Sequence, residues 1–217
     1  MKIKIYKDTN KKQLPVLILN SYEECGEEIY QKTKSNDYIL VEISDLDWNK
    51  NLSPWYMERL WKQEEDYSGK AKEYLEEIQN SIIPNLESEL KKENIEVTYY
   101  GIVGYSLAGL FALFTSYHTN CFSRIVSCSG SFWYPDFVEY CKENKISTNI
   151  NKIYFSLGNR EKDTKNIRMK SVEDRTKELE EYYEGFGIKA TYVEEEGNHF
   201  QNTTERQIKG IEWILRD

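Results

Sequence analysis

Histidine, cysteine and proline are scarce in this chain of 217 residues, and each scarcity excludes a class of protein. Two histidines and four cysteines, with no C-x-x-C pair, cannot supply a metal site of the usual ligand spacing. We therefore expect no metal, no other cofactor, and four reduced, partly buried thiols. The four prolines and eleven glycines do not gather into a linker, and the chain has neither an internal repeat nor a low-complexity tract.

The chain also lacks a long apolar run and an excess of positive charge. Residues 1–7 alternate lysine with apolar side chains, whereas a signal peptide needs a continuous apolar segment, and no stretch is typical of a membrane span. The formal net charge of −8 disfavours nucleic acid and anionic lipid as partners. The sequence therefore predicts a cytoplasmic protein that acts on small molecules, with neither nucleic acid nor a membrane as its partner.

What the chain does have is a regular alternation of strand and helix patterns. Its composition, 39% hydrophobic and 30% charged, is that of a globular protein, and its length suits a single domain over residues 1–217. The alternation predicts an α/β fold, with a mostly parallel sheet, helices on both faces and catalytic loops at the carboxyl ends of the strands. The predicted strands are 2–7, 15–20, 38–44, 96–103, 123–129, 152–157 and 188–194. The predicted helices are 22–34, 69–92, 107–117, 136–143, 167–185 and 203–215.

One irregular segment, residues 45–68, interrupts this alternation and is rich in aromatic residues. Long loops in compact domains are usually functional, so this segment is a candidate lid or pocket wall beside the active-site edge. The alternative is structural. Trp55, Met57, Leu60 and Trp61 have the spacing of a short helix that packs on the core.

The clearest functional signal lies in residues 99–111, which place Ser106 on a sharp turn between an apolar strand and an apolar helix. Such a nucleophile elbow presents a strained serine and requires small residues two positions before and after it. Gly104 and Ala108 occupy these positions, so alanine replaces the last glycine of the usual G-x-S-x-G pattern. The alternative is a serine that merely caps the helix 107–117.

Two other glycine-rich motifs are excluded by the same residues. A phosphate-binding P-loop requires Lys and then Ser or Thr after its last glycine, but Gly109 is followed by Leu110 and Phe111. A dinucleotide-binding fingerprint requires G-x-G-x-x-G, and the spacing of Gly101, Gly104 and Gly109 does not supply it.

A serine hydroxyl is a weak nucleophile at neutral pH and needs a general base, normally a histidine oriented by a carboxylate. His199 lies between the last predicted strand and the last predicted helix, on a loop expected at the same sheet edge as Ser106. His118 falls at the end of the helix 107–117, several turns away, where the helix dipole favours a positive charge. His199 is therefore the predicted base, against the alternative of an ordinary surface-loop histidine.

The orienting acid is expected after a strand between the serine and the histidine, because α/β-hydrolases order their triad Ser, Asp or Glu, His. Glu161 is the first candidate and Asp163 the second, since both follow the strand 152–157. Asp136, after the preceding strand, and the absence of any acid remain as alternatives. All these carboxylates could equally be solvated loop charges.

The oxyanion of a tetrahedral intermediate needs two N–H donors. A nucleophile elbow supplies one of them, here the backbone amide of Leu107. The turn after the strand 15–20 is expected to supply the other. Tyr22 is the predicted second donor of this oxyanion hole, with Ser21 as the next candidate.

In four motifs the chain resembles the Putative esterase family of α/β-hydrolases, which includes enterochelin esterases, S-formylglutathione hydrolase and feruloyl esterases. The resemblance implies the α/β-hydrolase fold, with Ser106 as nucleophile, His199 as base and Glu161 at the acid position. The motifs are residues 104–113, 128–133, 157–161 and 197–200.

The predicted function is therefore that of a serine hydrolase, which cleaves a carboxylic ester of a small molecule through an acyl-enzyme on Ser106. One alternative is a noncatalytic binding module that keeps the fold, because fold alone does not guarantee function. Ala108 in the elbow and the open choice of acid motivate it. Asn20 and Ser21 also stand where many members have an acidic residue or histidine followed by glycine, a difference that bears on the shape of the oxyanion hole. The other alternative is an acyltransferase, in which an alcohol replaces water as acceptor.

Overall fold

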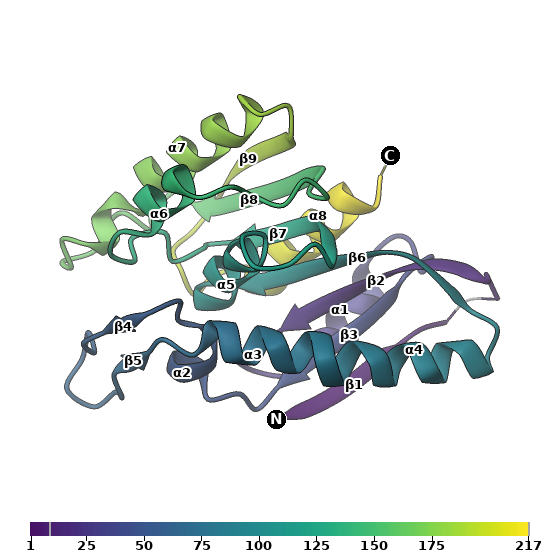
Figure 1. The fold of residues 1–217 in the computed structure, drawn as a ribbon. Helices are drawn as coiled ribbons and strands as arrows, with labels where there is room; N and C mark the ends of the chain where they lie inside the picture. Colours follow the sequence, from purple (N-terminus) through teal and green to yellow (C-terminus); the bar gives the residue numbers. More distant parts are fainter. Residues whose placement is uncertain (9, 217) are drawn as a thin grey trace.

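A seven-stranded sheet forms the centre of the protein (Figure 1). The computed structural model describes residues 1–8 and 10–216. The strand order is β1-β3-β2-β6-β7-β8-β9, in which β1 is antiparallel to β3 and the other neighbours are parallel. The predicted mostly parallel sheet is thus confirmed. Its strands are β1 (Lys2–Tyr6), β2 (Gln13–Asn20), β3 (Ile39–Ser44), β6 (Glu96–Tyr105), β7 (Phe122–Cys128), β8 (Lys152–Gly158) and β9 (Lys189–Glu195).

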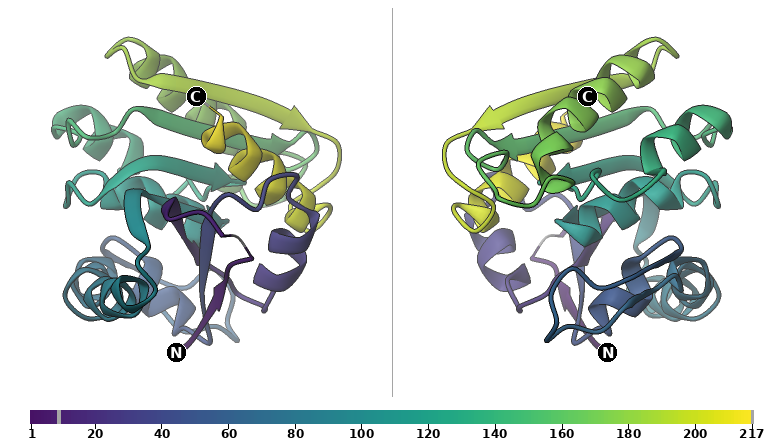
Figure 2. Two further views of the ribbon diagram at one scale, coloured as in Figure 1. Left: turned by 90° about the vertical axis from the view of Figure 1, so that its right-hand side faces the viewer. Right: turned by 90° about the vertical axis from the view of Figure 1, so that its left-hand side faces the viewer.

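Helices cover both faces of this sheet, as the two side views show (Figure 2). The central strand β2 is buried on both faces, so it forms a nearly continuous apolar run rather than an alternating one. Leu17 and Leu19 belong to a core shared with α1 and α8, whereas Val16 and Ile18 belong to the core on the opposite face. One face carries α1 (Gly26–Lys32) and α8 (Thr203–Leu215), and the other carries α4 (Ile83–Lys92), α5 (Leu107–Thr115), α6 (Phe137–Glu143) and α7 (Val172–Glu184).

The helix predicted over residues 69–92 is present over residues 71–92, with a π-helical segment in its middle. It consists of α3 (Ala71–Glu77), a π-helical turn (Ile78–Ile82) and α4. Pro84 lies in the first turn of α4, and a proline has no N–H with which to continue the helical hydrogen bonding. The wider turn accommodates this loss, so the helix continues through it.

The irregular segment 45–68 contains α2 (Trp48–Leu52) and a short ribbon of β4 (Tyr56–Met57) with β5 (Tyr67–Ser68). The helix considered for residues 55–61 is wrong. β4 instead buries Met57 and exposes its neighbour, which is the alternation of a strand. Aromatic residues of this segment therefore lie on a short helix, as Trp48 does, and on a β-ribbon, as Tyr56 and Tyr67 do.

The structure also describes the cysteines, possible metal-binding groups and the length of the apolar helices. All four cysteines are free, with Cys128 and Cys141 buried and Cys25 and Cys121 half-buried. Within residues 1–8 and 10–216, no three His, Cys, Asp or Glu side chains gather in a group able to hold a metal ion. No helix in the same residues has both the length and the apolar character needed to cross a bilayer.

Candidate active site

Ser106 lies on the turn between β6 and α5 with φ 59° and ψ −122°. A positive φ is strained for a residue with a side chain, and here hydrogen bonds hold it. The Ser106 N–H donates to the Cys128 carbonyl at 2.9 Å, and the Ser106 carbonyl accepts from the Ser131 N–H at 3.1 Å. Gly104 is essential to the turn, since a Cβ there would lie 2.2 Å from the carbonyl group of Ala108. Ala108 itself is fully buried, so the fold accommodates its methyl group.

The structure brings three of the predicted site residues into one chain of hydrogen bonds. Ser106 Oγ lies 3.0 Å from His199 Nε2, and His199 Nδ1 lies 2.7 Å from Glu161 Oε2. The three residues follow β6, β9 and β8, whose carboxyl ends meet at one edge of the sheet. Asp163 and Asp136, the other candidate acids, are exposed and make no such contact with the histidine. The arrangement can move a proton from the hydroxyl to the imidazole.

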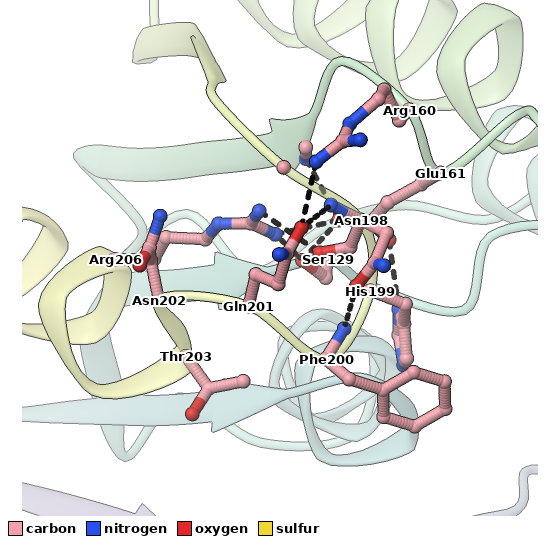
Figure 3. Close-up of polar contacts among 12 residues, drawn as sticks. Ser129, Arg160, Glu161, Asn198, His199, Phe200, Gln201, Asn202, Thr203 and Arg206 are labelled. Atoms are coloured by element: carbon pink, nitrogen blue, oxygen red, sulfur yellow. Dashed lines mark hydrogen bonds and ion pairs between the residues drawn. The ribbon is translucent and has the colours of Figure 1, made fainter.

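The Glu161 carboxylate is buried and accepts several hydrogen bonds (Figure 3). Its Oε1 lies 2.7 Å from Ser129 Oγ, 2.7 Å from the Gly158 nitrogen and 2.7 Å from Arg206 Nη1. Burial by itself would raise the pKa of Glu161, but the hydrogen bonds from His199, Ser129 and Gly158 outweigh it and hold the pKa below its usual value. The carboxylate is therefore charged at neutral pH and holds the Nδ1–H of the imidazole.

Arg206, on α8, is a site residue that sequence reasoning missed. Its side chain is 1% exposed and donates to Glu161, to the Tyr105 hydroxyl at 2.9 Å, and to the carbonyls of Glu196 at 3.2 Å and Asn198 at 3.1 Å. It thereby ties the acid to the loop that carries the histidine (Figure 3). A signal was present in the sequence, because this arginine lies on the otherwise buried face of an amphipathic helix.

The loop that carries His199 is fastened on both sides. The Tyr105 hydroxyl donates to the His199 carbonyl at 2.9 Å. Gln201 Oε1 accepts from Arg160 Nη2 at 2.9 Å and from the Asn198 N–H at 3.0 Å, which joins this loop to the one after β8 (Figure 3). The imidazole is thus positioned by its own loop as well as by the carboxylate.

The two predicted oxyanion donors lie on either side of the serine. Leu107 occupies the first position of α5, where a helix N–H has no acceptor within the helix. Tyr22 lies in the loop after β2, and its exposed ring packs edge-on against Trp48 at 5.2 Å. The N–H of Ser21, the second candidate, instead donates to the Ile43 carbonyl at 3.0 Å.

A second buried carboxylate, Glu42 on β3, shapes that loop and was also missed. Its Oε1 accepts from Ser21 Oγ at 2.9 Å and from the N–H groups of Cys25 at 2.7 Å and Gly26 at 2.8 Å. Its Oε2 accepts from the Tyr6 hydroxyl at 2.9 Å. The available signal was a single acidic residue within an otherwise apolar predicted strand. Glu42 therefore fixes the turn from which the second oxyanion donor is expected.

Ser106 and His199 both line two cavities, of about 570 Å³ and about 620 Å³. These volumes are typical of small-molecule sites, and together they leave room for the two halves of an ester. The first cavity lies between segment 45–68 and the loops after β7 and β8, and the second lies between the loop after β2 and the start of α8. The first is lined by Trp48, Trp61, Tyr67, Ser131, Trp133 and Met169, among others. The second is lined by Asn20, Ser21, Tyr22, Tyr105, Phe200 and Thr203, among others.

His118, the other histidine, lies just beyond the end of α5 and takes no part in this site. Its Nε2 is 3.0 Å from the Tyr140 hydroxyl, and its ring is 4.2 Å from that of Phe114. Burial lowers the pKa of His118, which opposes the positive charge that the dipole at the end of α5 favours.

Comparisons with known proteins agree with this architecture. A family model described as "Putative esterase" matches residues 1–207. "Uncharacterized protein YbbA" from Bacillus subtilis (strain 168) is 25% identical over 201 residues, which cover 88% of this chain and 78% of that protein. Siderophore hydrolase EstA from Aspergillus nidulans superposes with a TM-score of 0.74 at 17% identity, over 98% of this chain and 88% of EstA. An IroE-like serine hydrolase from Shewanella oneidensis also gives 0.74, at 15% identity, over 94% and 70% of the two chains. The predicted α/β-hydrolase fold is confirmed.

Proposed function

Since this chain belongs to the Putative esterase family, we propose that it is a serine esterase, which cleaves a carboxylic ester of a small molecule through an acyl-enzyme on Ser106. The observation that carries this proposal is the chain of hydrogen bonds from Ser106 Oγ through His199 to Glu161. Membership of the family supports ester hydrolysis, and the two cavities that meet at Ser106 support a small substrate.

In the proposed reaction, Ser106 Oγ attacks the ester carbonyl carbon while His199 Nε2 takes the hydroxyl proton. The backbone N–H groups of Leu107 and Tyr22 donate to the resulting oxyanion, and each such donor stabilises the transition state by about 3 kcal/mol. The carbon–oxygen bond to the leaving alcohol then breaks, and His199 returns the proton to that alcohol. Water attacks the acyl-enzyme in the same way, which releases the acid and restores the serine.

Glu161 has a positioning and electrostatic role in this scheme. Its charged carboxylate holds the Nδ1–H of His199, so that Nε2 is left free to accept the serine proton. When the imidazole becomes positively charged in the transition state, the same carboxylate stabilises that charge. The carboxylate keeps its own charge throughout the cycle.

The test is labelling with a fluorophosphonate, followed by steady-state hydrolysis of an ester panel. The panel varies acyl length and includes aryl esters and siderophore-like esters, since EstA is a siderophore hydrolase. Ser106→Ala is expected to abolish labelling and to lower kcat by roughly 10⁴-fold or more. Ser131→Ala is the matched control, because its hydroxyl lies 3.5 Å from Ser106 Oγ, and it is expected to retain labelling. Full esterase activity in Ser106→Ala would refute the proposal.

The same assays separate the two alternatives. A noncatalytic binding module would leave Ser106 unlabelled in well-folded protein. An acyltransferase would pass the acyl group to an added alcohol in preference to water, and the ratio of ester to acid among the products measures this partition.

A further inference from the structure

Asn20, the last residue of β2, has a buried amide group with only one end paired. The side chain is 0% exposed, and its Oδ1 accepts from the Tyr74 hydroxyl at 2.6 Å. Its Nδ2 has no hydrogen-bond partner in the described part of the chain. Folded proteins rarely leave a buried donor unpaired, so this group calls for a functional explanation.

The sheet register determines which way this side chain points. Asn20 is paired with Gly104 on the neighbouring parallel strand β6, and paired residues project from the same face of a sheet. A Cβ at Gly104 would meet the backbone of Ala108, so this is the face on which the first turn of α5 lies. Tyr74 reaches Asn20 from α3 on this same face. The amide therefore lies on the face of the sheet that the first turn of α5 covers.

The end of β2 also opens into a cavity of the active site. Asn20, Tyr22, Ser106 and His199 all line the cavity of about 620 Å³. An ester carbonyl attacked by Ser106 Oγ points its oxygen toward the first turn of α5 and the loop after β2, because these carry the expected backbone donors. That oxygen would then lie on the side of the serine from which Asn20 projects.

We propose that Nδ2 of Asn20 donates a hydrogen bond to the oxyanion of the tetrahedral intermediate, as a third donor beside the amides of Leu107 and Tyr22. The inference rests on the proposed esterase activity and adds a side chain to its catalytic residues. Tyr74 is a positioning residue, since its hydroxyl holds Oδ1 and so leaves Nδ2 as the end of the amide that can donate. Asn20 transfers no proton, and its hydrogen bond is released when the intermediate collapses.

A preorganised donor of this kind acts on the transition state more than on the bound substrate. Asn20→Ala removes the donor, and Asn20→Asp replaces it with a carboxylate of the same shape that repels the oxyanion. In both variants kcat is expected to fall by about 10²- to 10³-fold with KM changed only a few-fold. Tyr74→Phe, which keeps the ring and removes the hydroxyl, is expected to lower kcat by roughly tenfold, because the donor is then less well held.

A second measurement separates catalysis from folding. Affinity for a trifluoromethyl ketone, which forms an oxyanion on Ser106, is expected to fall in each Asn20 variant by the same factor as kcat. Asn51→Asp is the matched control, since Asn51 is half-buried on α2 and lines neither cavity, and its kcat is expected to stay within two-fold of wild type.

A purely structural role for Asn20 predicts a lower thermal midpoint with kcat and ketone affinity unchanged in the folded fraction, and that result overturns the inference. If both Asn20 variants fail to fold, unchanged kcat in Tyr74→Phe overturns it instead. Ester hydrolysis by the wild type, lost in Ser106→Ala but kept in the Asn20 variants, refutes only the role of Asn20. A wild type that hydrolyses no ester refutes the esterase proposal together with this one.

Discussion

Two buried carboxylates, Glu161 and Glu42, lie on opposite sides of Ser106 and are surrounded very differently. Glu161 accepts hydrogen bonds from an imidazole and a guanidinium as well as from neutral groups. Glu42 accepts from two hydroxyls and two backbone N–H groups, and no cation lies within ion-pair distance of it in the described residues. Glu161 therefore has an arginine and a histidine as neighbours, whereas Glu42 has only neutral hydrogen-bond donors.

The difference matches what each side of the site has to do. In the proposed reaction His199 gains and loses a positive charge in every turnover, so its neighbour Glu161 must stay ionised. Arg206 offsets the large cost of burying that charge. Glu42 instead has to keep one turn of backbone in shape, and neutral donors suffice for this. Burial of a carboxylate does not by itself indicate chemistry, because neutral donors can hold a carboxylate such as Glu42 in a structural role.

The largest expected effect comes from removing the charge of Glu161. Glu161→Gln is expected to lower kcat by roughly 10⁴-fold, because glutamine no longer fixes the imidazole tautomer or stabilises its positive charge. Steady-state hydrolysis of the best ester measures this. Asp163→Asn is the control, since this exposed carboxylate follows the same strand, and it is expected to change kcat by less than a few-fold. Equal losses in the two variants would mean that the acid has been wrongly assigned.

Arg206→Met removes the guanidinium that pairs with Glu161 and that has no counterpart beside Glu42. Removing one partner of a buried ion pair leaves the other uncompensated, so the free energy of unfolding is expected to fall by about 3–5 kcal/mol. Urea denaturation measures this change. Lys209→Met removes an exposed cation on the same helix, whose pair with Glu195 is worth about 1 kcal/mol or less. If Arg206→Met loses no more free energy of unfolding than Lys209→Met, Glu161 does not depend on its counter-ion.

Glu42→Gln tests the carboxylate with neutral partners. Its amide places two N–H donors against groups that themselves donate, so the free energy of unfolding is expected to fall by about 1–3 kcal/mol. A displaced β2–α1 loop also moves the proposed oxyanion donor, and we expect kcat to fall roughly tenfold. Glu23→Gln, on the exposed part of the same loop, is expected to stay within about 0.5 kcal/mol of wild type. If kcat is retained while stability falls, the loop does not contribute to the oxyanion hole.

The smallest effect is a change in stability with pH. The pKa of Glu161 is lowered in the folded protein, so its contribution is full above the unfolded pKa of about 4.3 and is lost as the pH falls through the lower folded pKa. The difference in free energy of unfolding between wild type and Glu161→Gln is therefore expected to narrow as the pH falls from 7 to 3. Urea titrations across this range provide the measurement. If the difference in free energy of unfolding between wild type and Glu161→Gln instead increases as the pH falls, the pKa of Glu161 is not lowered in the folded protein.

The mostly parallel sheet and the meeting of Ser106, His199 and Glu161 follow from local patterns in the sequence. Each of these residues lies in the turn or loop that follows a strand, and parallel strands bring their carboxyl ends to one edge. The order serine, acid, histidine then leaves few positions to consider. The topology of the sheet alone brings the three loops to the same edge.

Arg206, Glu42 and Asn20 could not be predicted in the same way. Their importance depends on contacts between elements far apart in the chain, such as that of Asn20 with Tyr74, and no spacing rule encodes such a pair. The helix considered for residues 55–61 was wrong for a related reason, because the β4–β5 ribbon forms only through pairing across a loop. Local sequence indicates whether a segment forms a helix or a strand. The role of a buried polar side chain instead depends on its hydrogen-bond partners, which come from distant parts of the chain.

The position of Arg206 on the last helix affects how the protein acquires its activity during synthesis. His199 and Arg206 follow the seventh strand of the sheet in the chain, while the strained Ser106 turn lies near the middle. A growing polypeptide therefore exposes Ser106, the proposed nucleophile, well before His199, the proposed base, and Arg206 have left the ribosome. In the proposed reaction the serine has no proton acceptor until β9 and α8 pack onto the sheet, so we expect the nascent chain to be inert toward esters.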